Sequence, residues 1–298
     1  MANHDIHGII PPMVTPFNSE GKIDEALHRT DVRYLLDAKV HGLAVCGSTG
    51  EGHTLTTGET RTISAATIEE VGGRIPVVTG IITNSTQAAI ERAKAVADLG
   101  VAALQVTPVH YLFRPEDEAM VAHFDRLAQA AGIPVIIYNV VPWSYLSPQL
   151  LVRILRDVDG VIGVKQSASD MKALADLLML TDDEQLRAKG VRILSAVDAL
   201  LYSSFSLGAH GAVAAILAAA PEWCVELWDA VHAGNHTRAR ELHILLLRLW
   251  NAIEAPNLPA NVRTAMKMQG REGGLPRPPM PVSSPEQTEA IRAALPGV

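Results

Sequence analysis

The chain has 298 residues, 48% of them hydrophobic and 19% charged, and its formal net charge is −7 at pH 7. This length suits one large globular domain, and the acidic balance argues against nucleic acid as a partner, because phosphate binding needs concentrated lysine and arginine. The two cysteines, Cys46 and Cys224, are too few for a disulfide framework and do not suggest a zinc site.

Eight short apolar runs rich in valine and isoleucine recur along the chain and have the length of β-strands. They are continuously apolar, as strands covered on both faces are. The runs are 8–14, 42–46, 75–81, 101–106, 133–138, 161–165, 191–195 and 211–216. Helical patterns lie between them, most clearly at 24–38, 86–99, 116–130 and 148–156.

Strict alternation of eight strands with helices predicts an α/β fold, a closed parallel (β/α)8 TIM barrel, rather than an open doubly wound sheet. The glycine fingerprint of a dinucleotide fold is also missing after the first strand, where Pro11 and Pro12 stand instead. Further helices are predicted at 221–232, 237–253, 259–269 and 285–295. We therefore expect a barrel with the active site in residues 1–220 and a C-terminal helical extension in residues 221–298.

The apolar run 211–220 is shorter than the ~20 residues that a membrane-spanning helix needs. The first residues also lack a basic stretch followed by an apolar one, so they do not resemble a secretory signal. We therefore expect a cytoplasmic protein with no membrane partner. No HxH or HExxH spacing is present among the eleven histidines, which argues against a metal-dependent mechanism.

Lys165 is the lysine that stands out, because it alone closes an apolar strand, after Val161, Ile162, Gly163 and Val164. If its side chain faces the barrel interior, a desolvated amine there can attack a carbonyl. A strand-end lysine that reaches solvent is the alternative, and the pattern alone leaves both open.

Two further features end strands of the same predicted barrel, where active sites of such barrels lie. Tyr138 ends the fifth strand and is either a proton relay or a core tyrosine with its hydroxyl in water. The turn Gly47-Ser48-Thr49-Gly50 follows the second strand and either forms a nest for a carboxylate or caps the next helix. Cys46, beside this turn, is expected to be a small buried hydrophobe.

Together these residues resemble the dihydrodipicolinate synthase / N-acetylneuraminate lyase superfamily, class I aldolases that form a Schiff base with pyruvate. The resemblance runs nearly end to end. It rests on residues 47–51, on Tyr138-Asn139-Val140 and on Gly163-Val164-Lys165, together with Val14-Thr15-Pro16-Phe17, Thr107-Pro108, residues 208–211 and the Leu275-Pro276 stretch.

The resemblance implies a role for each matching residue. Lys165 is similar to the Schiff-base lysine and Tyr138 to the proton-relay tyrosine. Ser48 and Thr49 match the pair that binds the keto-acid carboxylate, with Ser48 also bonded to the tyrosine. Val213 falls where an apolar side chain lies against the pyruvoyl group. It further implies that the only partner ligand is a small 2-keto acid, with no cofactor and no metal, in a homodimer or homotetramer.

Two departures from the family pattern bear on the site. The family places a tyrosine that crosses a dimer interface, as the third member of the proton relay, just after the Thr-Pro of the fourth strand. Here His110 holds that position and Tyr111 follows, so the resemblance leaves either residue as the candidate for this relay role. Dihydrodipicolinate synthases also carry an arginine shortly after the Tyr-Asn pair, and this chain has none. Trp143 and Tyr145 stand there and suit an apolar partner, while Arg114 is a possible replacement from a neighbouring loop.

The sequence thus predicts a class I lyase or aldolase that acts on pyruvate or a pyruvoyl-containing 2-keto acid with a non-standard aldehyde. The alternatives are dihydrodipicolinate synthase itself, which condenses pyruvate with aspartate semialdehyde, or a related 2-keto-3-deoxy-acid dehydratase. A barrel that only binds a keto acid is a third possibility, which the presence of Lys165, Tyr138 and the hydroxyl pair argues against.

Overall fold

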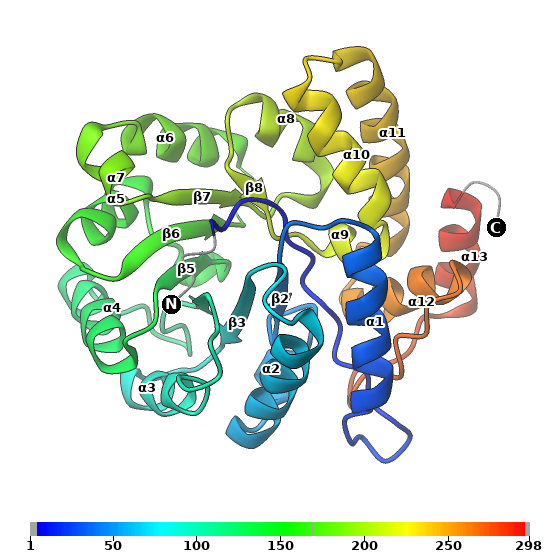
Figure 1. Cartoon of the computed structure of the whole chain (residues 1–298), viewed down its shortest axis with the longest axis horizontal. Helices are drawn as coiled ribbons and strands as arrows, with labels where there is room; N and C mark the ends of the chain where they lie inside the picture. Colours follow the sequence, from blue (N-terminus) through cyan, green and yellow to red (C-terminus); the bar gives the residue numbers. More distant parts are fainter. Residues whose placement is uncertain (1–4, 168–169, 296–298) are drawn as a thin grey trace.

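The computed structural model describes residues 5–167 and 170–295, in which eight parallel strands curl into a ring that helices surround (Figure 1). The strands are β1 (Gly8–Ile9), β2 (Leu43–Val45), β3 (Val77–Ile81), β4 (Ala103–Val106), β5 (Val135–Asn139), β6 (Val161–Gln166), β7 (Arg192–Ser195) and β8 (Gly211–Ala212). Hydrogen-bonded neighbours follow the order β1-β8-β7-β6-β5-β4-β3-β2. A parallel bridge between Pro12 and Ala44 then joins the segment after β1 to β2, which closes the ring. The predicted TIM barrel is confirmed.

Helices follow the strands around the ring. They are α1 (Glu25–Asp37), α2 (Thr57–Val71), α3 (Thr86–Lys94), α4 (Asp117–Ala131), α5 (Pro148–Asp157), α6 (Met171–Thr181), α7 (Glu184–Ala188), α8 (Leu201–Ser206), α9 (Ala215–Ala219), α10 (Pro221–His232), α11 (His236–Ile253), α12 (Leu258–Met268) and α13 (Pro285–Ala294). Local sequence sets their ends. The side chains of Thr56 and Glu59 form a capping box at the start of α2, which satisfies N–H groups that the helix leaves free.

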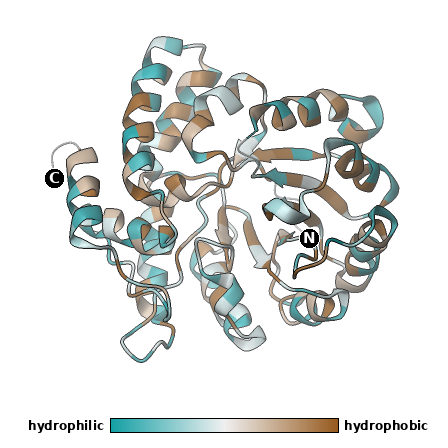
Figure 2. Ribbon diagram, turned by 180° about the vertical axis from the view of Figure 1, so that it is seen from behind, coloured by the Kyte–Doolittle hydropathy of each residue, from teal (hydrophilic) through white to brown (hydrophobic). Residues whose placement is uncertain are grey.

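The core has an inner and an outer part. Inside the ring, apolar side chains from successive strands form one buried cluster: Ile6, Ile10, Ala44, Val78, Ala103, Ile136, Leu194 and Val213. Outside it, two larger clusters fill the space between strands and helices. Figure 2 shows this as apolar strands wrapped by helices whose outer faces are hydrophilic. The polar site residues therefore lie at the ends of the strands, beyond the apolar interior.

Two predicted strands are wrong in their second halves. The predicted strand 8–14 is a continuous strand only at Gly8–Ile9, as β1, and then pairs through the isolated bridge at Pro12, because Pro11 and Pro12 have no N–H to donate to a ladder. The predicted strand 211–216 ends at Ala212, and helix α9 begins at Ala215. An Asp198 carboxylate oxygen accepts the Ile216 N–H at 2.8 Å, which stabilises the start of that helix.

The C-terminal helices pack directly on the barrel. One apolar cluster joins Val32 and Leu35 of α1 to Leu227 of α10, Leu249 of α11 and Ile291 of α13. The division at residue 220 therefore stays a prediction. Across the described residues, no helix is both long and apolar enough to cross a membrane.

Candidate active site

Lys165 lies on β6 beside Tyr138 on β5, because the two strands pair in a register that sets these residues opposite each other. The lysine is buried, with 3% of its surface exposed. Its Nζ lies 3.7 Å from the centre of the Tyr138 ring, so the amine rests on the face of the phenol. Of the two positions that the sequence left open, the structure shows the buried one.

The Tyr138 hydroxyl points across the mouth of the barrel toward the turn after β2. It donates a hydrogen bond to Ser48 Oγ at 3.1 Å. Tyr138 thus contacts the lysine with its ring and the serine with its hydroxyl. The structure therefore brings together three of the residues predicted for the site, from strands β5 and β6 and the loop after β2.

The Ser48–Thr49 turn is held by a tightly folded backbone. Gly52 N donates to Gly47 O at 2.9 Å, and a Cβ on Gly52 would lie 1.8 Å from Cys46 O, so only glycine fits there. Beneath the turn, Glu51 forms a buried ion pair with Arg263 of α12 at 2.7 Å. Within the described chain, the N–H groups of Ser48 and Thr49 donate to no other protein group, so both are available to an anion.

A cavity of about 380 Å³ opens above these residues. Lys165, Tyr138, Ser48, Thr49 and Val213 all line it, so the predicted substrate-binding residues share one site. The remaining wall is largely apolar and comes from the segments after β5, β7 and β8, from around the start of α12 and from the segment before α13: Val140, Ala196, Ala214, Ala215, Pro256, Leu258, Pro259 and Met280. Among the described lining residues no arginine is present.

Three polar residues in this cavity were not predicted from the sequence: Asp198, Ser167 and His53. Asp198 follows β7; burial raises the pKa of its carboxyl to about 6, opposed by the Ile216 N–H and by the positive charge of Lys165. Ser167 lies two residues after Lys165, and its buried Oγ has no hydrogen-bond partner in the described part of the chain. For Asp198 and Ser167 the one available signal was their place just after a strand, which many unremarkable polar residues share.

His110 and Tyr111 do not line the cavity of their own chain. His110 is half-buried, with Nδ1 3.0 Å from Pro108 O, and Tyr111 is 68% exposed. The relay role of either residue therefore stays a prediction.

Trp143, expected to suit an apolar partner, does not line this cavity. Its Nε1 donates to His110 O at 2.6 Å, and this bond holds the indole against the outer loop, 62% exposed. Tyr145 likewise does not line the cavity. Arg114 pairs with Asp117 at 2.6 Å and also lies outside the lining, so it does not replace the missing arginine within this chain.

Cys46 is buried, and burial raises the pKa of its thiol to about 12. A thiol with such a pKa is not a nucleophile at neutral pH. The expectation of a small buried hydrophobe is met.

Comparison with known proteins decides the family. Residues 5–296 match the model of the dihydrodipicolinate synthetase family. The chain belongs to this family. It is 33% identical over 293 residues to a 4-hydroxy-tetrahydrodipicolinate synthase of Methanopyrus kandleri, covering 97% of this chain and 95% of the relative. A protein of the same name from Methylobacterium radiotolerans is 34% identical over 301 residues, covering 99% and 97%.

Solved structures agree. A dihydrodipicolinate synthase of Bacillus anthracis superposes with a TM-score of 0.90 at 29% identity, covering 99% of both chains. A dihydrodipicolinate synthase of Thermotoga maritima superposes with a TM-score of 0.90 at 28% identity, covering 98% of both chains. Members of the family are class I lyases that bind pyruvate through a lysine Schiff base and need no metal or other cofactor. The chain is accordingly a class I lyase that acts on pyruvate or a pyruvoyl-containing 2-keto acid.

Proposed function

We propose that Lys165 forms the Schiff base and that the chain joins pyruvate to, or releases it from, an uncharged aldehyde. The observation that carries this proposal is the composition of one cavity. A buried lysine, a tyrosine and two hydroxyl residues line it together, and no arginine is among its described lining residues.

In the first step the Lys165 amine attacks the keto carbon of pyruvate, and the resulting carbinolamine loses water to give the imine. Tyr138 is placed to move the protons of this step, because its ring contacts Lys165 Nζ and its hydroxyl is bonded to Ser48. Loss of a methyl proton then gives the enamine, whose carbon attacks the aldehyde; the reverse sequence cleaves the product.

The pyruvate carboxylate is proposed to bind at the Ser48–Thr49 turn. Two N–H groups and two hydroxyls converge there next to the cavity, which suits an anion. Val213, buried on β8's C-terminal side, supplies an apolar surface for the methyl end.

Asp198 is proposed to stabilise positive charge on the Schiff base. Its carboxylate lines the same cavity, and the charge of Lys165 opposes the rise that burial causes in its pKa. A protonated imine is a better electron sink than a neutral one, so an ionised Asp198 favours enamine formation.

The second substrate is proposed to carry no carboxylate near its aldehyde. A buried carboxylate needs a paired cation, and an arginine would bind it in a bidentate way. Much of the cavity wall is instead apolar, with Val140, Leu258 and Met280 among its residues. The alternative is 4-hydroxy-tetrahydrodipicolinate synthase, the name that the 33–34% identical relatives carry.

We also propose a homo-oligomer, a dimer or tetramer. Four apolar side chains on the loops after β4 and β5 are exposed: Tyr111, Leu112, Phe113 and Trp143. Exposed apolar side chains on two neighbouring loops favour burial against a second copy. His110 or Tyr111 would then complete a relay in the partner's cavity. The cytoplasm as location stays a prediction from composition.

Borohydride reduction in the presence of pyruvate, followed by intact mass, tests the Schiff base. The native protein should gain one pyruvate-derived adduct, and Lys165→Ala should gain none while keeping its circular-dichroism spectrum. Lys172→Ala is the matched control, because Lys172 lies on α6 and pairs with Asp176 at the surface. If the native protein binds pyruvate but gains no adduct, the barrel only binds the keto acid and the proposed Schiff base is wrong.

A panel of aldehydes tests the second substrate. With pyruvate present, benzaldehyde should turn over faster than aspartate semialdehyde by at least about tenfold, since an unpaired carboxylate is costly in this cavity. Robust formation of the cyclic product from aspartate semialdehyde would support the alternative function.

A further inference from the structure

A second cavity of about 610 Å³ adjoins the catalytic one. His53, Pro256 and Met280 line both, so the two spaces meet at these side chains. We call the second space the outer chamber. Its far wall is formed by the proline-rich segment 279–282, which crosses from α12 toward α13.

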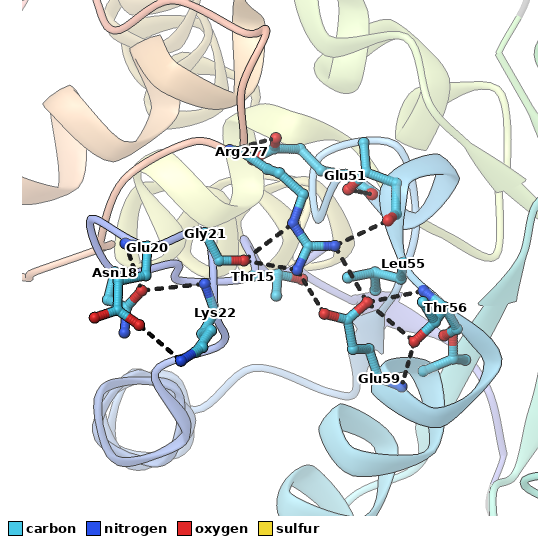
Figure 3. A network of polar contacts seen from close by, with 12 residues as sticks. Thr15, Asn18, Glu20, Gly21, Lys22, Glu51, Leu55, Thr56, Glu59 and Arg277 are labelled. Atoms are coloured by element: carbon cyan, nitrogen blue, oxygen red, sulfur yellow. Dashed lines mark hydrogen bonds and ion pairs between the residues drawn. The ribbon is translucent and has the colours of Figure 1, made fainter.

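The charged groups around the outer chamber are already paired. The Arg277 guanidinium binds Glu59 and Gly21 O, as Figure 3 shows, and it also donates to Thr54 O. Glu51 pairs with Arg263 and also accepts the Arg277 N–H at 3.0 Å.

The amides in the wall are paired as well. Asn257 and Gln287 each donate to the other, at 3.1 and 2.9 Å. Thr54 and Ser284 also have partners, so among the described lining residues His53 is the polar side chain without a partner in the described chain. Apart from His53, the charged side chains described in this wall are all paired, so a charged ligand group would find no other free opposite charge there.

The apolar part of the wall is exposed to solvent and held in place. Pro256, Pro279, Pro281 and Val282 are all exposed. The segment is fixed at one end by Arg277 and at the other by Ser283, whose Oγ donates to Asn261 at 2.7 Å. An apolar surface that is open and rigid before a ligand arrives is suited to binding an uncharged apolar group.

We propose that the outer chamber receives the far end of the second substrate, an uncharged chain or aromatic ring that extends from the aldehyde past Met280 and His53. The inference rests on the proposed function, since the near end of this substrate is bonded to the pyruvoyl carbon on Lys165. The site then selects its second substrate by the length and apolarity of the chain or ring beyond the aldehyde.

The test uses unbranched 2-oxo acids as product-like probes, trapped on the native protein with borohydride and quantified by intact mass. The series is pyruvate, 2-oxobutanoate, 2-oxo-4-phenylbutanoate, 2-oxo-6-phenylhexanoate and the charged 2-oxoadipate. The half-saturating concentration of 2-oxo-6-phenylhexanoate should be at least about tenfold below that of 2-oxobutanoate. The half-saturating concentration of the charged 2-oxoadipate should not fall below that of 2-oxobutanoate.

Val282→Trp supplies the second half of the test, because Val282 lines the outer chamber and not the catalytic cavity. The variant should raise the half-saturating concentration of the long phenyl acid by about tenfold and leave that of pyruvate unchanged. Leu275→Trp is the matched control; Leu275 lies a few residues before the segment 279–282, is 43% exposed and does not line the chamber. This control should leave the half-saturating concentrations of both the long phenyl acid and pyruvate unchanged.

The outcomes separate the two claims. If pyruvate itself gives no adduct, the proposed function fails and the inference falls with it. If pyruvate is trapped but the long phenyl acid gains nothing over 2-oxobutanoate, the inference alone is overturned. The same holds if 2-oxoadipate gains as much as the phenyl acid, or if Val282→Trp and Leu275→Trp behave alike.

Discussion

The Tyr138 hydroxyl and Ser48 Oγ lie 3.1 Å apart across the mouth of the barrel, while the ring of the same tyrosine contacts Lys165 Nζ. This geometry predicts that the hydroxyl, and not the ring, carries the proton transfer. Tyr138→Phe should therefore lower kcat by about 10²–10⁴-fold with little change in stability. Steady-state turnover with pyruvate and thermal denaturation check it. Unchanged turnover in this variant would remove Tyr138 from the relay.

The rate of imine formation should change with pH near pH 6, because Asp198 ionises there. Burial raises the pKa of this carboxyl to about 6, so the group ionises as the pH rises through that value. Since the ionised form stabilises the charged imine, the rate should rise through pH 6 in the native protein. Asp198→Asn, which keeps an oxygen to accept the Ile216 N–H, should abolish this pH dependence. A pH dependence that persists in this variant would assign it to another group.

The ion pair of Glu51 with Arg263 should be important for stability. Both groups are buried, and removing one partner of such a pair leaves an uncompensated charge that costs about 3–5 kcal/mol. Glu51→Gln should lower the free energy of unfolding by this amount, and it should also raise KM for pyruvate because Glu51 underlies the Ser48–Thr49 turn. Urea denaturation measures the first effect. Glu118→Gln, which breaks the exposed pair with Arg153, is the control and should have little effect.

Stability should fall as the pH drops from about 6.5 to 4, in part through His28. Burial, aided by the charge of Arg29, lowers the pKa of His28 to about 4, so the unfolded chain binds a proton there before the folded chain does. The neutral ring contributes stability that is full above pH 6.5 and is lost as the pH falls toward 4.

The structure agrees with a neutral His28. Thr67 Oγ donates to Ile63 O, so His28 Nε2 donates to Thr67 at 2.7 Å, and the buried Nδ1 has no partner within the described chain. Replacing His28 with Gln should reduce the loss of unfolding free energy between pH 7 and 4.5 by about 2–3 kcal/mol. Denaturation curves at the two pH values measure it. An equal loss in both proteins would contradict the assignment.

The sequence was sufficient for the barrel and for the centre of the site. Lys165 and Tyr138 were visible because each is a polar residue that closes an apolar strand, and strand ends meet at one rim of a barrel. Asp198 and Ser167 were missed because each lies in a loop, where polar residues are ordinary.

The differences between the sequence predictions and the structure have specific physical causes. The direction of Trp143 depends on one hydrogen bond from its Nε1 to His110 O, which no sequence pattern reveals. The strand predicted for 211–216 gave way to α9, because Asp198, from a different loop, caps that helix. Contacts between loops distant in the sequence decided both.

Proteolysis and tandem mass spectrometry of the protein reduced with borohydride in the presence of pyruvate test the central claim most directly. The account predicts a single modified lysine, Lys165, within the peptide that contains β6. Modification of another lysine at saturating pyruvate, with Lys165 unmodified, would contradict it.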